Sequence, residues 1–92
     1  PFAAKAEGVL LKLEEVIEWC KARMVCHPKD LVYIEGAGGL MSPIADTETH
    51  IEWIQALEIP VLLVCGTYLG AISHALTTLS TLNHYNIPIH AV

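Results

Sequence analysis

The segment Leu31–Leu40 constrains the fold of this chain more than any other, because a short apolar run ends there at a carboxylate and passes directly into glycines. The run Leu31–Ile34 predicts a strand that is buried on both faces. The glycines that follow allow backbone conformations and close approaches that a Cβ atom blocks. Ligands of an open parallel sheet bind outside the carboxyl ends of its strands, so Glu35 is the first candidate to face a ligand, a metal ion or water. The alternative is that Glu35 only caps a turn and the glycines only redirect the chain.

The rest of the chain alternates between helical and strand patterns. Thr49 followed by Glu52 matches a capping box at the start of a short helix. The other predicted elements are a helical turn over residues 1–7 that Gly8 ends, helices over residues 10–24 and 70–85, a strand over residues 61–65 and a further strand from residue 88. This order is the βαβ alternation of a parallel sheet with helices on its faces, so the predicted fold class is α/β, with residues 1–92 as a single domain.

Composition limits the functions that the chain can have. It has 92 residues, of which 53% are hydrophobic and 16% charged, and a domain of this size buries only about two-thirds of its unfolded surface. We therefore expect a partner subunit or another part of the same protein to cover some apolar surface. The net charge of -5 and the lack of a basic patch argue against nucleic-acid binding. No long apolar run and no signal-like start occur, so we expect no membrane span and a cytoplasmic location.

The helix over residues 70–85 has an unusual polar side. No Asp, Glu, Lys or Arg occurs from Gly66 to Val92. The polar positions of the helix carry only hydroxyls and imidazoles, at Ser73, Thr77, Ser80 and His84. Such a surface suits a partly buried contact better than open water, so we expect a neighbouring subunit there. The backbone N–H groups at the start of the helix, with Ser73 as an added donor, predict an anion site for a carboxylate or phosphate.

The cysteines and histidines suggest no metal site by their spacing. Cys20, Cys26 and Cys65 are odd in number and form no CxxC pair, so we expect buried free thiols. His27 follows Cys26, but no further ligand lies at a usable spacing. His50 is interpreted as a surface or cap-adjacent residue and not as a catalyst, because no acid or nucleophile can be placed beside it.

Several motifs together resemble dethiobiotin synthase. They are the glycine-rich stretch, the proline and aspartate that follow it, the second apolar run and the start of the last helix: Glu35-Gly36-Ala37-Gly38-Gly39, Pro43, Asp46, Ile59-Pro60-Val61-Leu62-Leu63-Val64 and Leu69-Gly70-Ala71-Ile72-Ser73-His74. The opening Pro1-Phe2-Ala3-Ala4 with Glu7-Gly8 is also similar to that family. The glycine motif is shared with P-loop amidoligases of cobalamin synthesis, whereas the Leu-Gly-x-Ile-x-His stretch is more particular.

The resemblance implies a P-loop NTPase-like, three-layer α/β fold and an ATP-dependent ligase of biotin biosynthesis. Such an enzyme closes the cyclic urea of dethiobiotin from 7,8-diaminononanoate, carbon dioxide and ATP, with Mg²⁺ as a cofactor. By similarity, Glu35 would be a magnesium ligand, and the nucleotide would lie along Glu35, Gly36, Ala37 and Gly38. The substrate would contact Gly38 and, from the neighbouring subunit of a homodimer, Leu69, Gly70, Ala71, Ile72 and Ser73. Ser73 stands where an Asn is common in the family.

The chain also departs from the family pattern. It contains no GxxxxGK[ST], so the phosphate-binding loop is absent from it. The resemblance implies that the family's substrate-side Lys and its second carboxylate ligand for magnesium would lie in the same N-terminal part, which is missing here. We assign no catalytic residue within the chain and expect these residues to be inactive by themselves. The start at Pro1, without a methionine, suggests a fragment, a processed product or an incompletely built chain. The open alternatives are a cobyrinate-type amidoligase, a ParA-like ATPase and a non-catalytic, truncated dimerisation module.

Overall fold

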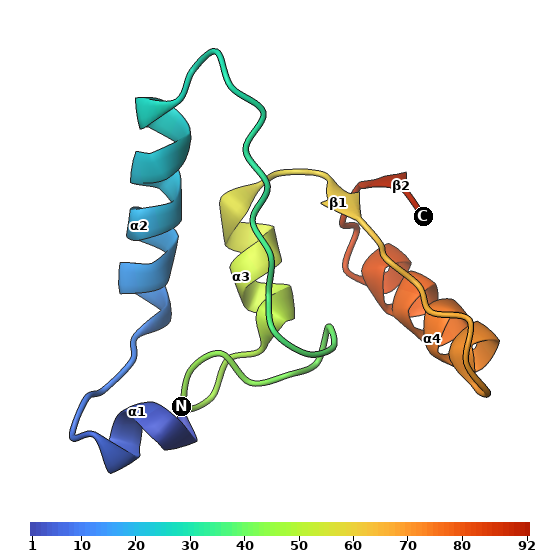
Figure 1. Ribbon diagram of the computed structural model, residues 1–92, viewed down its shortest axis with the longest axis horizontal. Helices are drawn as coiled ribbons and strands as arrows, with labels where there is room; N and C mark the ends of the chain where they lie inside the picture. Colours follow the sequence, from blue (N-terminus) through green and yellow to red (C-terminus); the bar gives the residue numbers. More distant parts are fainter. The chain divides into compact units, whose positions relative to one another are not determined.

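The computed structural model describes all 92 residues, which form two compact units, residues 1–57 and residues 58–92. The first unit contains α1 (Phe2–Ala6), α2 (Leu13–Cys26) and α3 (His50–Leu57), and the second contains β1 (Val61–Leu62), α4 (Ala71–His84) and β2 (Ile89–Ala91) (Figure 1). All four predicted helical segments form. Gly8, with a φ of 74°, follows α1 as expected. None of the helices combines the length and apolar character needed to cross a membrane.

Helix α2 has an amphipathic pattern but begins at Leu13, not at Leu10 as expected. The acidic side chains in its first turn favour a helix start at that point, because they lie near the positive end of the helix dipole. The helix ends before His27, since Pro28 disfavours the helical conformation in the residue that precedes it. The boundaries of α2 therefore follow from local sequence signals.

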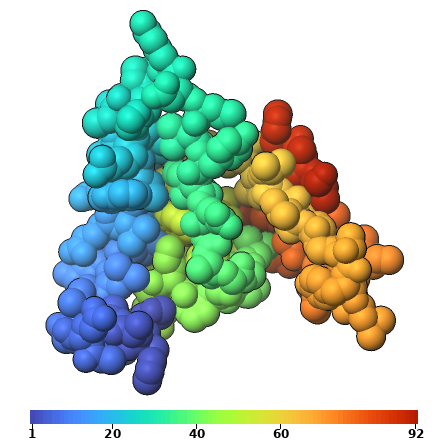
Figure 2. All heavy atoms as spheres, viewed as in Figure 1, coloured from blue at the N-terminus to red at the C-terminus, as the bar shows by residue number.

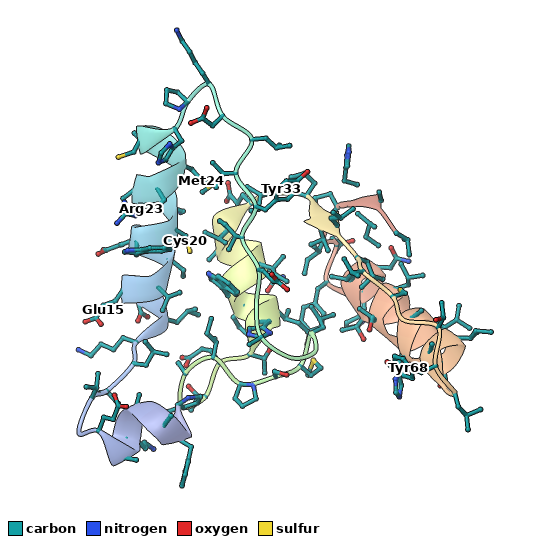
Figure 3. The ribbon with its side chains drawn as sticks, in the orientation of Figure 1. Glu15, Cys20, Arg23, Met24, Tyr33 and Tyr68 are labelled. Carbon is teal, nitrogen blue, oxygen red and sulfur yellow. The ribbon has the colours of Figure 1, made fainter.

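The core of the first unit lies where α2 meets α3. Its buried residues on these two helices are Leu13, Cys20, His50, Ile51, Trp53 and Leu57. Cys20 points from α2 toward α3, whereas Glu15 points away from it (Figure 3). Cys26 and Cys65 are exposed free thiols, so the expectation of buried cysteines is correct only for Cys20. Cys26 is the last residue of α2, and Cys65 follows a short strand, so neither lies in a packed stripe.

The strand predicted over Leu31–Ile34 does not form. The segment is extended but pairs with no other strand, and the side chains of Leu31 and Tyr33 are 78% and 74% exposed. The alternate residues, Val32 and Ile34, are only partly covered. Figure 2 shows the segment beside α2 and over α3. The prediction of a strand buried on both faces is therefore wrong for this structure, because a strand needs a ladder partner and the first unit supplies none.

The second unit is a βαβ arrangement in which α4 connects two parallel strands. Val61 pairs with Ile89 and Leu62 with Ala91, so β2 carries one more residue than β1 between the paired positions. The predicted parallel pairing is confirmed. The predicted strand over residues 61–65 is shorter than expected, because its partner ends at Ala91, whose carbonyl accepts the last ladder hydrogen bond, from Leu63 (2.9 Å). The predicted third strand appears as β2.

Candidate functional site

The chain bends and turns within residues 36–42, which follow Glu35 and which we call the glycine turn. Gly38 has a φ of 95°, and a Cβ atom built on it would lie 2.5 Å from the hydroxyl oxygen of Ser42. Only glycine adopts this conformation without strain. Ser42 closes the turn, because its hydroxyl accepts a hydrogen bond from the Gly39 N–H (2.9 Å) and its own N–H donates to the Gly39 carbonyl (2.9 Å). Gly38 adopts a backbone conformation that a Cβ atom blocks, as expected for these glycines, whereas Ser42 was not foreseen as part of the turn.

Gly36 lies against the first turn of α3. A Cβ atom at this position would lie 3.1 Å from Cε1 of His50 and 3.2 Å from Cζ3 of Trp53. Carbon atoms pack at about 3.5–4.0 Å, so a side chain here would push the segment away from the helix. Gly36, which follows Glu35, can therefore lie directly against α3 because it has no side chain.

His50 connects α3 to the glycine turn at two further points. Its Nδ1 lies 3.0 Å from the carbonyl oxygen of Gly39, and its backbone N–H donates to the carbonyl of Ser42 (3.1 Å). A carbonyl oxygen only accepts, so Nδ1 carries the hydrogen of this bond. His50 is cap-adjacent, as expected, but it is only 8% exposed. The expectation of a surface position is wrong, because the side chain lies on the inward face of α3.

The predicted capping box at the start of α3 is confirmed. Thr49 and Glu52 are hydrogen bonded to each other, and the hydroxyl of Thr49 accepts a bond from the N–H of Ile51. The pKa of Glu52 is lowered, first by the hydrogen bond from the Thr49 hydroxyl and then by the bond from the Thr49 backbone N–H. Glu52 is therefore occupied by the helix cap and is not a candidate ligand.

Glu35 is exposed, and its carboxylate takes part in no hydrogen bond or ion pair within the chain. Mg²⁺ prefers oxygen ligands and is often held by one or two protein carboxylates together with water and phosphate oxygens. The side chain of Glu35 fits this role. No cluster of three or more metal-ligating side chains occurs in the chain, so a cation at Glu35 would have one protein carboxylate and no all-protein cage.

The residues after Glu35 fit a nucleotide only in part. The backbone N–H groups of Gly36, Ala37 and Gly38 make no backbone hydrogen bonds and are available as donors. The phosphate cradle of a P-loop also needs a lysine in a GxxxxGK[ST] loop, which this chain does not contain. These residues can contact a phosphate but cannot supply the whole cradle.

A hollow of about 350 Å³ lies between α2, the extended segment and α3 in the first unit. Its lining includes Val16, Trp19, Cys20 and Arg23 of α2, residues 32–35 and Trp53 of α3. The indole N–H of Trp53 is buried and has no hydrogen-bond acceptor. Glu35 is thus at once a lining residue of this hollow and the residue that precedes the glycine turn.

Residues 69–73 lie at the start of α4 in the second unit. Gly70 is the N-cap residue with a φ of 90°, and the N–H of Ala71 is bonded to the Tyr68 carbonyl (3.0 Å). The next two N–H groups, of Ile72 and Ser73, have no backbone acceptor. They match the donors expected for an anion, and the assignment of an anion site remains a prediction.

The expected site residues are divided between the two units. Glu35 and the glycine turn form one arrangement with α3 in the first unit, whereas residues 69–73 belong to the second unit. His50 and Trp53 were not expected as neighbours of the turn. Their spacing with Leu57, at intervals of three and four, indicates one face of a helix. It does not indicate that this face lies against the turn.

Comparisons with known proteins agree with the resemblance found in the sequence. The family model described as AAA domain matches residues 1–92. An ATP-dependent dethiobiotin synthetase of Methylobacterium nodulans is 48% identical over 91 residues, which are 98% of this chain and 40% of that protein. The protein of the same name from Phenylobacterium zucineum is 45% identical over 92 residues, which are 100% of this chain and 39% of that protein. The chain therefore spans about two-fifths of the length of these curated relatives.

Proposed function

We propose, from the premise that this chain belongs to the AAA domain family, that it forms part of an ATP-dependent dethiobiotin synthetase. The observation that carries the proposal is the identity of 45% and 48% to enzymes of that name over nearly the whole chain. The reaction implied is the closure of a cyclic urea from 7,8-diaminononanoate, carbon dioxide and ATP. These relatives do not favour the alternatives of a cobyrinate-type amidoligase, a ParA-like ATPase or a truncated module.

Glu35 is the proposed protein ligand of Mg²⁺. Its carboxylate is exposed and has no partner in the chain, so no existing ion pair has to break when a cation binds. When bound, Mg²⁺ offsets the negative charge on phosphate oxygens during phosphoryl transfer. The turn at Gly36, Ala37 and Gly38 presents backbone donors and no bulky side chain, so phosphate oxygens can approach the main chain closely.

The start of α4 is proposed to bind the carboxylate of the diamino acid. The N–H groups of Ile72 and Ser73 are free of backbone acceptors, and a helix N-terminus favours negative charge. The Ser73 hydroxyl can donate a further hydrogen bond. We also place Gly38, Leu69, Gly70 and Ala71 along the substrate, on the strength of the resemblance alone.

We further propose that α4 lies at the interface of a homodimer in a cytoplasmic enzyme with a three-layer α/β fold. Ile72 and Leu76 occupy adjacent turns of α4 and are 78% and 61% exposed. The polar side chains of the same helix include no charge. An uncharged surface with exposed apolar residues is suited to a protein contact.

The proposal is tested on the complete protein that contains this chain. The purified protein is incubated with ATP, Mg²⁺, bicarbonate and 7,8-diaminononanoate, and dethiobiotin and ADP are quantified by mass spectrometry. We expect one ADP per dethiobiotin formed. A parallel reaction with cobyrinate, glutamine and ATP serves as the comparison. Amidation of cobyrinate without any formation of dethiobiotin would reject the proposed function.

A further inference from the structure

His50 is the one buried polar residue of the chain, and both hydrogen bonds that it makes outside α3 lead to the glycine turn. It is 8% exposed, although it lies at the first position of α3, where a histidine could easily face water. Buried polar groups normally have a hydrogen-bond partner. The partner of His50 is the carbonyl of Gly39, eleven residues earlier in the chain. This bond therefore joins two segments and does not merely cap the helix.

His50 contacts the turn at its beginning, middle and end. The Cε1 and Nε2 edge of the ring lies where a Cβ of Gly36 would come within 3.1 and 3.2 Å. Nδ1 holds the Gly39 carbonyl at 3.0 Å. The backbone N–H of the same residue donates to the carbonyl of Ser42 at 3.1 Å. One residue thus contacts the turn both where it leaves the extended segment and where it ends.

The imidazole itself is held in place by its neighbours on α3. Its ring centroid lies 5.6 Å from that of Trp53, with the two planes tilted by 50°. The residue before it, Thr49, is fixed by its hydrogen bonds to Glu52. Because Nδ1 donates to a carbonyl, the neutral ring has its lone pair on Nε2. The donor that holds Gly39 is therefore present in both the neutral and the protonated ring.

Glu35 depends on this arrangement because its side chain makes no hydrogen bond or ion pair that would fix it. Its carboxylate has no partner in the chain, so its position follows from the backbone at Gly36, which lies against His50 and Trp53. We infer that His50 is a positioning residue that, through its ring contact with Gly36 and its hydrogen bond to Gly39, places the Glu35 carboxylate and the turn for a divalent cation and phosphate. This inference rests on the proposed function of Glu35 as a metal ligand.

The test compares three substitutions of His50 in the complete protein. His50→Asn places an amide N–H near the position of Nδ1 and keeps the donor for Gly39. His50→Gln places its amide near the position of Nε2, and His50→Phe keeps a ring but removes the donor. His27→Phe is the matched control, because His27 is exposed and its side chain bonds only to Asp30.

The readouts are the Kd for Mn²⁺, used as a paramagnetic probe of the magnesium site, and the melting temperature. Groups that orient a metal ligand typically change metal affinity by about 10-fold to 100-fold when they are lost, so we expect His50→Phe and His50→Gln to raise the Kd at least about tenfold. We expect the Kd of His50→Asn to stay within about threefold of the wild-type value. A side chain that only fills space would not distinguish His50→Asn from the other two variants in this way. The Kd of the His27→Phe control should not change.

Three outcomes overturn the inference. The first is a Kd of the Phe and Gln variants equal to that of the wild type. The second is a Kd that rises in the variants with lowered melting temperatures, whether or not they keep the hydrogen-bond donor for Gly39. The third is unchanged Mn²⁺ binding in Glu35→Gln, which would show that Glu35 is not the ligand. If the wild type binds Mn²⁺ through Glu35 but forms no dethiobiotin, only the proposed reaction is rejected. The Kd values of the His50 variants then still test whether His50 positions Glu35.

Discussion

The carboxylate of Glu52 accepts two hydrogen bonds of 2.7 Å from Thr49, one from its hydroxyl and one from its backbone N–H. The Thr49 hydroxyl in turn accepts a bond of 3.3 Å from the N–H of Ile51. These bonds satisfy donors that the start of a helix otherwise leaves unpaired. Because His50 is the first residue of α3, this cap also fixes the position of His50, which bonds to the glycine turn.

We expect the stability of the first unit to fall in acid through Glu52. Its pKa is lowered by the Thr49 hydroxyl and then by the Thr49 backbone N–H. A carboxyl group with a lower pKa in the folded state stabilises the fold above its unfolded pKa, and this contribution is lost as the pH falls through the folded pKa. Glu52→Gln should therefore lower the melting temperature at neutral pH and show a smaller further loss below about pH 4 than the wild type.

Thermal melts of the complete protein between neutral and acid pH measure this effect. Glu18→Gln is the control, since Glu18 is an exposed glutamate in the middle of α2 whose carboxylate takes part in no hydrogen bond or ion pair. The prediction fails if Glu52→Gln loses as much stability in acid as the wild type does.

Gly38 and Gly39 should differ in their tolerance of alanine. A Cβ on Gly38 meets Ser42, and the residue has a φ of 95°, whereas a Cβ on Gly39 has nothing within 4 Å. The left-handed backbone costs a residue with a Cβ about 1–2 kcal/mol, so Gly38→Ala should lower the free energy of unfolding by at least that amount. Gly39→Ala should change it by less than about 0.5 kcal/mol. Equal denaturation midpoints of the two variants would contradict the geometry of the turn.

The helices could be predicted because their signals are local. Cys20 in α2 and Leu82 in α4 lie on stripes that the spacing of apolar residues indicates, and both are buried. The cap at Thr49 is a pattern of four consecutive residues and forms as expected. The start of α2 was placed too early because Leu10 continues the apolar spacing, while the acidic side chains that mark the true start come only after Leu13.

The strands could be predicted only in part, because a strand depends on a partner that lies elsewhere in the sequence. Val61 and Leu62 pair with β2, but the apolar run continues to Val64, which has no partner and is exposed. Leu31 and Tyr33 have the composition of a buried strand and are nevertheless exposed. The composition of a segment indicates that it can form a strand. Whether the strand forms depends on a partner strand supplied by the rest of the fold.

The candidate site was found through Glu35 and its glycines, but the side chain that supports the turn was not. In the sequence, His50 lies at the start of a helix, where polar residues are common because they can bond to nearby backbone groups. Its bond to Gly39 spans two elements and cannot be read from spacing. A glycine motif therefore indicates where a turn lies, whereas the structure indicates what holds it.

Glu35→Gln should reduce activity without a change in folding. The carboxylate is exposed and unpaired, so its loss should change the free energy of unfolding by less than about 0.5 kcal/mol. Loss of a group that stabilises charge in the transition state typically slows a reaction by about 100-fold or more, and we expect this of dethiobiotin formation. Rates measured across a Mg²⁺ titration give the comparison. Glu15→Gln, whose side chain points away from α3 (Figure 3), is the control. A Glu35→Gln variant with the activity of the wild type at every Mg²⁺ concentration would remove Glu35 from the site.

The final prediction concerns α4 as a subunit interface. Thr77 and Ser80 are exposed on a helix without charged residues, and the Thr77 hydroxyl bonds only to the Ser73 carbonyl of the same helix (2.8 Å). Thr77→Glu or Ser80→Glu would bury an unpaired carboxylate in a dimer, at a cost of about 3–5 kcal/mol if the contact excludes water. A cost of about 4 kcal/mol raises the dimer dissociation constant roughly a thousandfold, which sedimentation velocity of the complete protein measures directly. Ala22→Glu, at an exposed position of α2, should leave the dimer intact. A wild-type monomer, or dimers that all three variants retain equally, would show that α4 does not form the interface.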